Sequence, residues 1–169
     1  APSGLSLAGT LRTTDHSIAL GNSEATITLL ADTTINSGSG GLHLVSPVST
    51  GEAAYALHLF STGATTIDGN LSSAGAMSFA GPITFSATNT TVSASTMTFG
   101  GPVTAAGSLT IHGATVINGG SVDTGAHAQT YDGTVDIGGA ATSTTTLSGV
   151  GITFGRTLDA TSRVKVNDS

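Results

Sequence analysis

One short pattern recurs along this chain and constrains its fold more than any other feature. The pattern reads apolar, any, apolar, any, small, any, apolar; the copy at Gln129 carries glutamine in the first apolar place, and the copy at Ile152 carries Arg156 in the small place. Alternation with a period of two is typical of a β-strand with one buried face. Strands of three to five residues are too short to be stable alone, so we expect them to stack on one another. The six copies begin at Leu5, Leu42, Met77, Met97, Gln129 and Ile152.

A longer spacing is visible when whole stretches are aligned. Residues 57–81 match residues 109–133 at an offset of 52, and further matches at offsets of 56 and 52 start at Ile27, Ile83 and Val135. We therefore expect residues 1–169 to form a single β-solenoid segment of about three 52–56 residue repeats, which begins and ends part-way through a repeat. Three rungs of about 18 residues per repeat predict roughly 8–10 rungs. At ~4.8 Å per rung, the solenoid is expected to be a rod about 40 Å long.

Composition favours the same all-β fold class. Thr occurs 30 times and Gly 24 times, which suits short strands joined by tight turns. Charged residues make up 8% of the chain, and hydrophobic residues make up 38%. Intrinsic disorder is excluded because it requires low hydrophobicity together with high charge. No stretch of ten residues has helical periodicity.

Charge and cysteine content exclude several kinds of partner. The net charge is −6, and the chain has only four basic residues. A surface that binds nucleic acid needs a cluster of Lys and Arg, so no nucleic-acid partner is expected. No apolar run approaches the ~18 residues of a membrane-spanning helix, so no membrane insertion is expected. Without cysteine, neither disulfides nor thiolate metal sites are expected.

Histidines are the first candidates for chemistry. His43 and His58 occupy the middle of two Leu-His-Leu strands, and His112 follows a third strand of the same kind. Stacked on adjacent rungs they would form a ladder able to bind metal or respond to pH. Metal sites need additional ligands, and the sequence indicates no carboxylate at matching positions. We therefore interpret these residues as solvated strand histidines and expect no metal and no cofactor.

The carboxylates and hydroxyls do not form a recognisable catalytic set. Most aspartates stand next to Gly or Thr, as Asp32, Asp68 and Asp132 do, where the side chain bonds to nearby backbone in a turn. Glycoside hydrolysis needs two carboxylates flanking one bond. No nucleophile elbow and no phosphate-binding loop is present. The chain is expected not to be an enzyme, and no catalytic or cofactor-binding residue is assigned.

A row of threonines on the outer surface would be a further candidate for a functional face. A flat threonine face orders water in several ice-binding solenoids, and the later copies of the pattern carry Thr at the outward mid-strand position. The structural alternative is that Thr simply suits strands. The row read along the copies consists of Ser6, His43, Ser78, Thr98, Thr130 and Thr153.

The repeats resemble those of filamentous-haemagglutinin-like adhesins, which are very large bacterial surface or secreted proteins. The resemblance lies in a Leu-Thr-Ile strand at Leu109, an Asn-Gly-Gly turn at Asn118, a Gln-Thr-Tyr strand at Gln129 and Thr-Phe-Gly strands at Met97 and Ile152. It covers most of residues 25–166. It implies a right-handed parallel β-helix, export to the bacterial cell surface or medium, and a role in adhesion, biofilm or fibre formation.

Taken together, these features predict the structural shaft of a secreted bacterial adhesin or extracellular filament. Unpaired strand edges at the two ends template pairing with further strands. We therefore expect the ends either to continue covalently into more repeats or to associate end-to-end into fibres, and host or matrix glycans are candidate partners. The alternatives are a carbohydrate-binding or carbohydrate-degrading β-helix, which needs a groove of aromatic and acidic residues, and the threonine ice-binding face.

Overall fold

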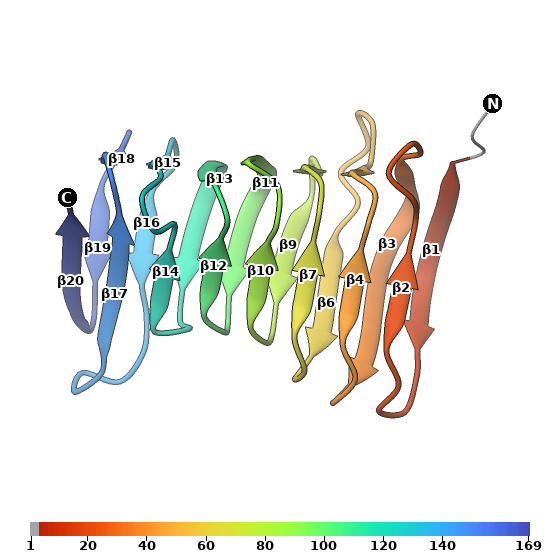
Figure 1. Cartoon of the computed structure of the whole chain (residues 1–169), viewed down its shortest axis with the longest axis horizontal. Coiled ribbons are helices and arrows are strands. Elements are labelled where there is room, and N and C mark those ends of the chain that lie inside the picture. The colour runs from red at the N-terminus through yellow and green to blue at the C-terminus, as the bar shows by residue number, and fades with distance from the viewer. Residues whose placement is uncertain (1–3) are drawn as a thin grey trace.

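The computed structural model describes residues 4–169, which form a parallel β-solenoid of eight turns (Figure 1). The strands lie side by side across the long axis, and the two ends of the chain lie at opposite ends of the rod. Every strand pairing is parallel, and each turn pairs with the next turn along the chain. The predicted all-β parallel solenoid is confirmed, and eight turns lie at the lower bound of the predicted number. Among residues 4–169 no helix is long and apolar enough to cross a membrane.

Each turn has three faces, and the first two belong to one twelve-stranded sheet. In four turns a long strand bends from the first face to the second, with register shifts after Leu7 and Ser93 marking the bend. In the other four turns two short strands replace the long one. These strands are β1 (Leu5–Arg12), β3 (Ile27–Gly38), β5 (Val48–Ser49) with β6 (Leu57–Ser61), β8 (Leu71–Ser72) with β9 (Ala76–Phe79), β11 (Asn89–Phe99), β13 (Ser108–Ile117), β15 (Gln129–Tyr131) with β16 (Val135–Ile137), and β18 (Ile152–Phe154) with β19 (Leu158–Ala160).

The third face is a separate sheet to which each turn contributes one strand. Most of these strands have three residues, two facing the core and one facing solvent. In chain order they are β2 (Ile18–Leu20), β4 (Leu42–Leu44), β7 (Thr65–Ile67), β10 (Ile83–Phe85), β12 (Val103–Ala105), β14 (Ser121–Asp123), β17 (Thr144–Gly149) and β20 (Arg163–Asp168).

The recurring sequence pattern marks a corner of the solenoid. In every copy the first three residues lie in a strand, and the last apolar residue lies beyond a bend on the next face. The copy at Met77 turns from the second face to the third, whereas the copy at Gln129 turns from the first to the second. The pattern therefore identifies strands and corners, but it does not identify which of the three faces a strand belongs to.

The turns vary in length, and most are longer than the sequence pattern predicted. The register partners Thr65 and Ile83 delimit one of the shortest turns, whereas Val122 and Leu147 delimit the longest. The predicted number of residues per turn was too low because the extra residues lie in the corners, which carry no regular sequence pattern. The 52-residue spacing relates strand-and-corner segments on different faces, since Leu57 lies on the second face and Leu109 lies on the first.

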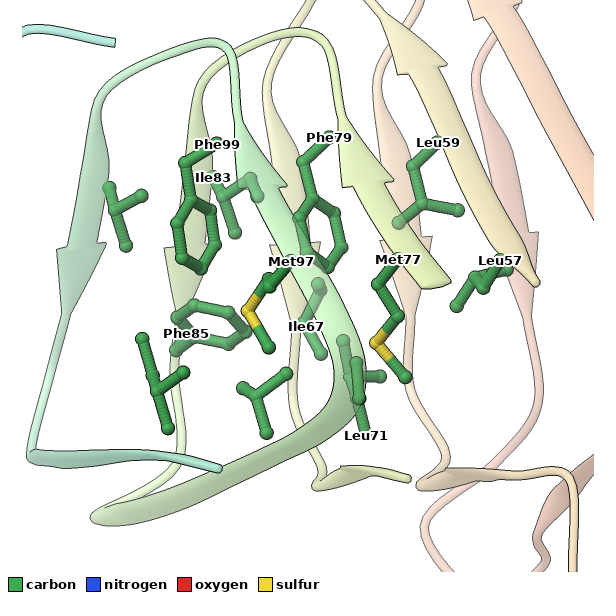
Figure 2. Close-up of a cluster of buried hydrophobic side chains, with 14 of the residues drawn as sticks. Leu57, Leu59, Ile67, Leu71, Met77, Phe79, Ile83, Phe85, Met97 and Phe99 are labelled. Carbon is green, nitrogen blue, oxygen red and sulfur yellow. The ribbon is translucent and has the colours of Figure 1, made fainter. Parts of the chain in front are cut away.

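The core consists of rows of apolar side chains that continue from turn to turn (Figure 2). Met77 and Met97 are register partners, as are Phe79 and Phe99, so like side chains stack directly. The rings of Phe79 and Phe99 have centroids 5.3 Å apart and planes inclined by 11°. Phe85 packs into the same region from the third face, and no part of it is exposed. Stacking like residues in register buries a continuous stripe that no single strand could bury.

Glycines occupy the corner between the second and third faces where successive turns approach closely. A Cβ on Gly81 would lie 1.9 Å from the Ser61 carbonyl oxygen of the preceding turn. A Cβ on Gly101 would lie 2.3 Å from the Gly81 carbonyl carbon, and one on Gly119 would lie 1.9 Å from the Gly101 oxygen. Only residues without a side chain allow the backbone to pass this corner at the spacing of the ladder.

Candidate functional site

The three candidate histidines lie on three different faces. His43 is in β4 on the third face, His58 is in β6 on the second, and His112 is in β13 on the first. The histidine ladder that was considered and set aside in favour of solvated strand histidines does not form, because the Leu-His-Leu pattern occurs at more than one face of the turn. Among residues 4–169 no group of three or more His, Cys, Asp or Glu residues could hold a metal ion.

Two of these histidines instead contact an aspartate of the next turn. His43 Nε2 lies 2.7 Å from Asp68 Oδ2. His112 Nδ1 lies 2.5 Å from Asp132 Oδ2. The expectation that no carboxylate matches the histidines was wrong, and the side chains of Asp68 and Asp132 contact neighbouring turns of the solenoid. Each pair connects two adjacent turns, which the sequence pattern could not indicate because a whole turn of chain separates the partners.

Asp68 is the more constrained of the two aspartates. The Ser86 hydroxyl donates a hydrogen bond to its Oδ1, while His43 contacts Oδ2. Partial burial raises the pKa of Asp68, but the hydrogen bonds with Ser86 and His43 outweigh that effect, so the pKa lies below 3.8. The cluster therefore favours the ionised carboxylate and contacts residues from three successive turns.

Replacing Asp68 by asparagine is expected to lower stability at neutral pH by less than about 1 kcal/mol, because the cluster is partly exposed. A carboxyl whose pKa is lower in the folded state stabilises the fold above its unfolded pKa of 3.8, and this contribution disappears as the pH falls through the folded value. The difference between wild type and Asp68→Asn should thus shrink on acidification. Urea unfolding at several pH values measures it, with the exposed Asp136→Asn as control. A difference that grows in acid would contradict the assignment.

A shallow depression adjoins His43 on the third face. Its volume is about 210 Å³, and it is lined by small or polar side chains together with Ile18, Leu42 and His43. It contains no aromatic and no acidic side chain. Of the two tyrosines, Tyr131 is 1% exposed, so its ring is not available to stack on a sugar. These features do not favour the carbohydrate alternative.

The row of outward residues considered as an alternative ice-binding face does not lie on one face. Ser6, Thr130 and Thr153 lie on the first face, Ser78 and Thr98 on the second, and His43 on the third. A different row exists on the first face, where Thr91, Thr110, Thr130 and Thr153 are register partners. The residues two positions further along the chain are Ser93, His112, Asp132 and Gly155. The threonine row is one residue wide and does not form a flat two-row face.

A buried polar network interrupts the core in the seventh turn. Gln129 is fully buried, and its Nε2 donates to the carbonyl oxygens of Ser148 at 2.5 Å and Val122 at 3.1 Å. The Tyr131 hydroxyl donates to Gln129 Oε1 at 3.0 Å, and burial raises the pKa of Tyr131 above its usual value. Gln129 stands in an apolar place of the recurring sequence pattern, and its polarity is the signal for this network.

Replacing Gln129 by leucine is expected to cost about 1–3 kcal/mol, because the Tyr131 hydroxyl and two carbonyl groups lose a partner inside the core. Tyr131→Phe alone should also destabilise, since it leaves Gln129 Oε1 without its donor. The double variant should be less destabilised than the two single effects predict when added. Urea unfolding of the four proteins measures the coupling, and strict additivity would contradict the network.

Both ends of the rod leave core positions partly open. In the first turn Leu5, Leu7, Leu11 and Leu20 are half-buried, whereas their counterparts in the central turns are buried. In the last turn Leu158 is 37% exposed and Val166 is 45% exposed. The outer edges of the first-turn and last-turn strands have no pairing partner among residues 4–169.

Comparison with known proteins identified no protein similar to this chain. No family model, no curated protein and no solved structure matches this chain. The structure of residues 4–169 therefore offers three features that bear on function. These are a continuous ladder with largely neutral outer faces, cross-turn His–Asp pairs and two open ends.

Proposed function

We propose that this chain is a stiff shaft segment of a secreted bacterial adhesin or extracellular filament. The observation that carries the proposal is the unbroken parallel pairing through eight turns, with apolar side chains in register along the core. A rod of this kind holds whatever it is attached to at a fixed distance. The resemblance of the repeats to filamentous-haemagglutinin-like adhesins supports the same role and a bacterial surface location.

The outer surface supports a spacer rather than a binding module. Outward positions on the strands are mostly short neutral side chains, such as Thr66, Thr84 and Thr104 on the third face. The His–Asp pairs couple adjacent turns and so resist separation of the turns along the axis. Such features stabilise a rod without requiring a ligand.

Mechanical loading tests this role directly. Single chains held at their two ends and stretched along the axis should resist extension until several turns unfold together. The resistance follows from neighbour-only stacking, in which each turn is stabilised by the two beside it. A chain that unwinds one turn at a time under small loads would be unsuited to a shaft.

Location is tested separately in cells that carry the gene. Antibodies raised against residues 4–169 should label intact cells or the material around them, and external protease should remove that label. Labelling that appears only after the cells are permeabilised would overturn the proposed surface role.

A further inference from the structure

The first and last turns present matching cross-sections. The innermost rows of the core run from Leu5 to Phe154 on the first face, from Leu11 to Ala160 on the second, and from Ile18 to Val166 on the third. If the ladder continued by one more turn, Phe154 would be followed by a residue in the position of Leu5. In the same way Ala160 would be followed by Leu11, and Val166 by Ile18. The first turn of a second copy supplies an apolar residue at all three positions.

The backbone of the last turn is also oriented for this pairing. Arg163 N–H donates to Ser143 O, and Ser169 N–H donates to Gly149 O, so both point back into the rod. The direction of N–H groups alternates along a strand, so the N–H groups of Val164 and Val166 point away from the rod. Between earlier turns such a group bonds to the residue that precedes its register partner, as Leu42 N–H does to Ala64 O. The Val166 N–H would therefore donate to the Ser17 carbonyl of a second copy.

Charge favours a head-to-tail arrangement over contact between like ends. Three of the four basic residues lie in the last turn, at Arg156, Arg163 and Lys165. The same register that aligns Val166 with Ile18 sets Arg163 opposite Asp15, an exposed residue whose Oδ1 accepts hydrogen bonds from the N–H and the hydroxyl of Ser39 in the second turn. On the second face it sets Asp159 diagonal to Arg12, within the reach of a long side chain.

We propose that a second copy of this chain binds head-to-tail, with its first turn pairing in register on the last turn of the preceding copy. This inference rests on the proposed shaft role and extends it by naming the partner. A contact between two different surfaces of identical chains does not close on itself when the axis is straight, so copies would add into a filament. Exposed strand edges and the open apolar rows provide the pairing, and Arg163 with Asp15 determines the polarity.

Sedimentation velocity of the whole chain over a range of concentrations tests the proposal. Wild type should form species that grow with concentration. Arg163→Glu and Asp15→Lys should each weaken association about tenfold, because an attraction becomes a repulsion. Glu52→Lys makes the same charge change at an exposed position of the third turn, between β5 and β6, and should leave association unchanged. An equimolar mixture of the Arg163→Glu and Asp15→Lys variants should recover assembly, because each end of one variant then meets an oppositely charged end of the other.

Val166→Pro gives a test that does not depend on charge. Proline removes an N–H that points away from the rod, so the chain's own ladder keeps its bonds, and circular dichroism should report an intact fold. Association should be lost. A wild type that stays monomeric, or an assembly insensitive to both Val166→Pro and the charge reversals, would overturn the inference. A monomer that still resists stretching would leave the shaft role standing, so the two proposals fail by different measurements.

Discussion

Replacing Phe99 by alanine is expected to lower the free energy of unfolding by about 3–5 kcal/mol. The ring is fully buried at a central turn and stacks on Phe79 of the preceding turn at 5.3 Å. Removing it leaves a cavity between two turns that β-ladders hold at fixed spacing, so the walls can move little. Because each turn contacts only its neighbours, the loss should weaken the coupling between the two halves of the rod.

Phe60 provides a matched control for this variant. It has the same side chain but is 45% exposed and points away from the core. Phe60→Ala should change stability only slightly. Thermal and urea unfolding followed by circular dichroism measure both variants. Equal effects of the two substitutions would contradict the core described above.

Gly81→Ala is expected to cost about 1–3 kcal/mol or more, although it adds a single methyl group. The new Cβ would lie 1.9 Å from the Ser61 carbonyl oxygen, which is backbone and cannot rotate away. The corner must open, and this strains the pairing of β10 with β7 beside it. Gly101 stacks on Gly81 in the next turn, so the displacement should also spread along the rod.

Gly41→Ala is the appropriate comparison because it makes the same change at the same corner of the second turn, between β3 and β4. There the nearest atom to the added Cβ is the Ala64 oxygen at 3.4 Å, close to ordinary contact. We expect Gly41→Ala to be close to neutral or slightly stabilising, since alanine restricts the unfolded chain. The unfolding midpoints of the Gly41→Ala and Gly81→Ala variants, measured under the same conditions, test this difference in stability. A larger loss at Gly41 than at Gly81 would contradict the close corner.

The strands were predictable from the sequence because burial of one face imposes a period of two wherever a strand occurs. Met77-Ser78-Phe79 and Leu42-His43-Leu44 are both strands, as predicted. The faces were not predictable, because all three corners accept the same pattern of strand, small residue and strand. The copy that contains His43 therefore lies on the third face, and the similar strand that contains His58 lies on the second.

Contacts between side chains of adjacent turns could not be predicted from the sequence for a related reason. Pairing His112 with Asp132 requires the length of one turn, and this length varies along the rod. An error of two residues in the register moves a side chain to a different position on its face or past a corner. Gln129 could have been noticed as a polar residue in an apolar place, but its partners Ser148 and Val122 became evident only with the register.

Because the corners vary in length, the length of the rod and the composition of its surface can change independently. The length of the rod depends on the number of turns, because each turn adds one strand spacing whatever its number of residues. Its surface decoration depends on the corners, which already accommodate turns of different length. A peptide inserted in the corner at residues 138–143, between β16 and β17 in the longest turn, would project from the side and leave the length of the rod unchanged. The corner sequences can therefore change without a change in the length of the rod.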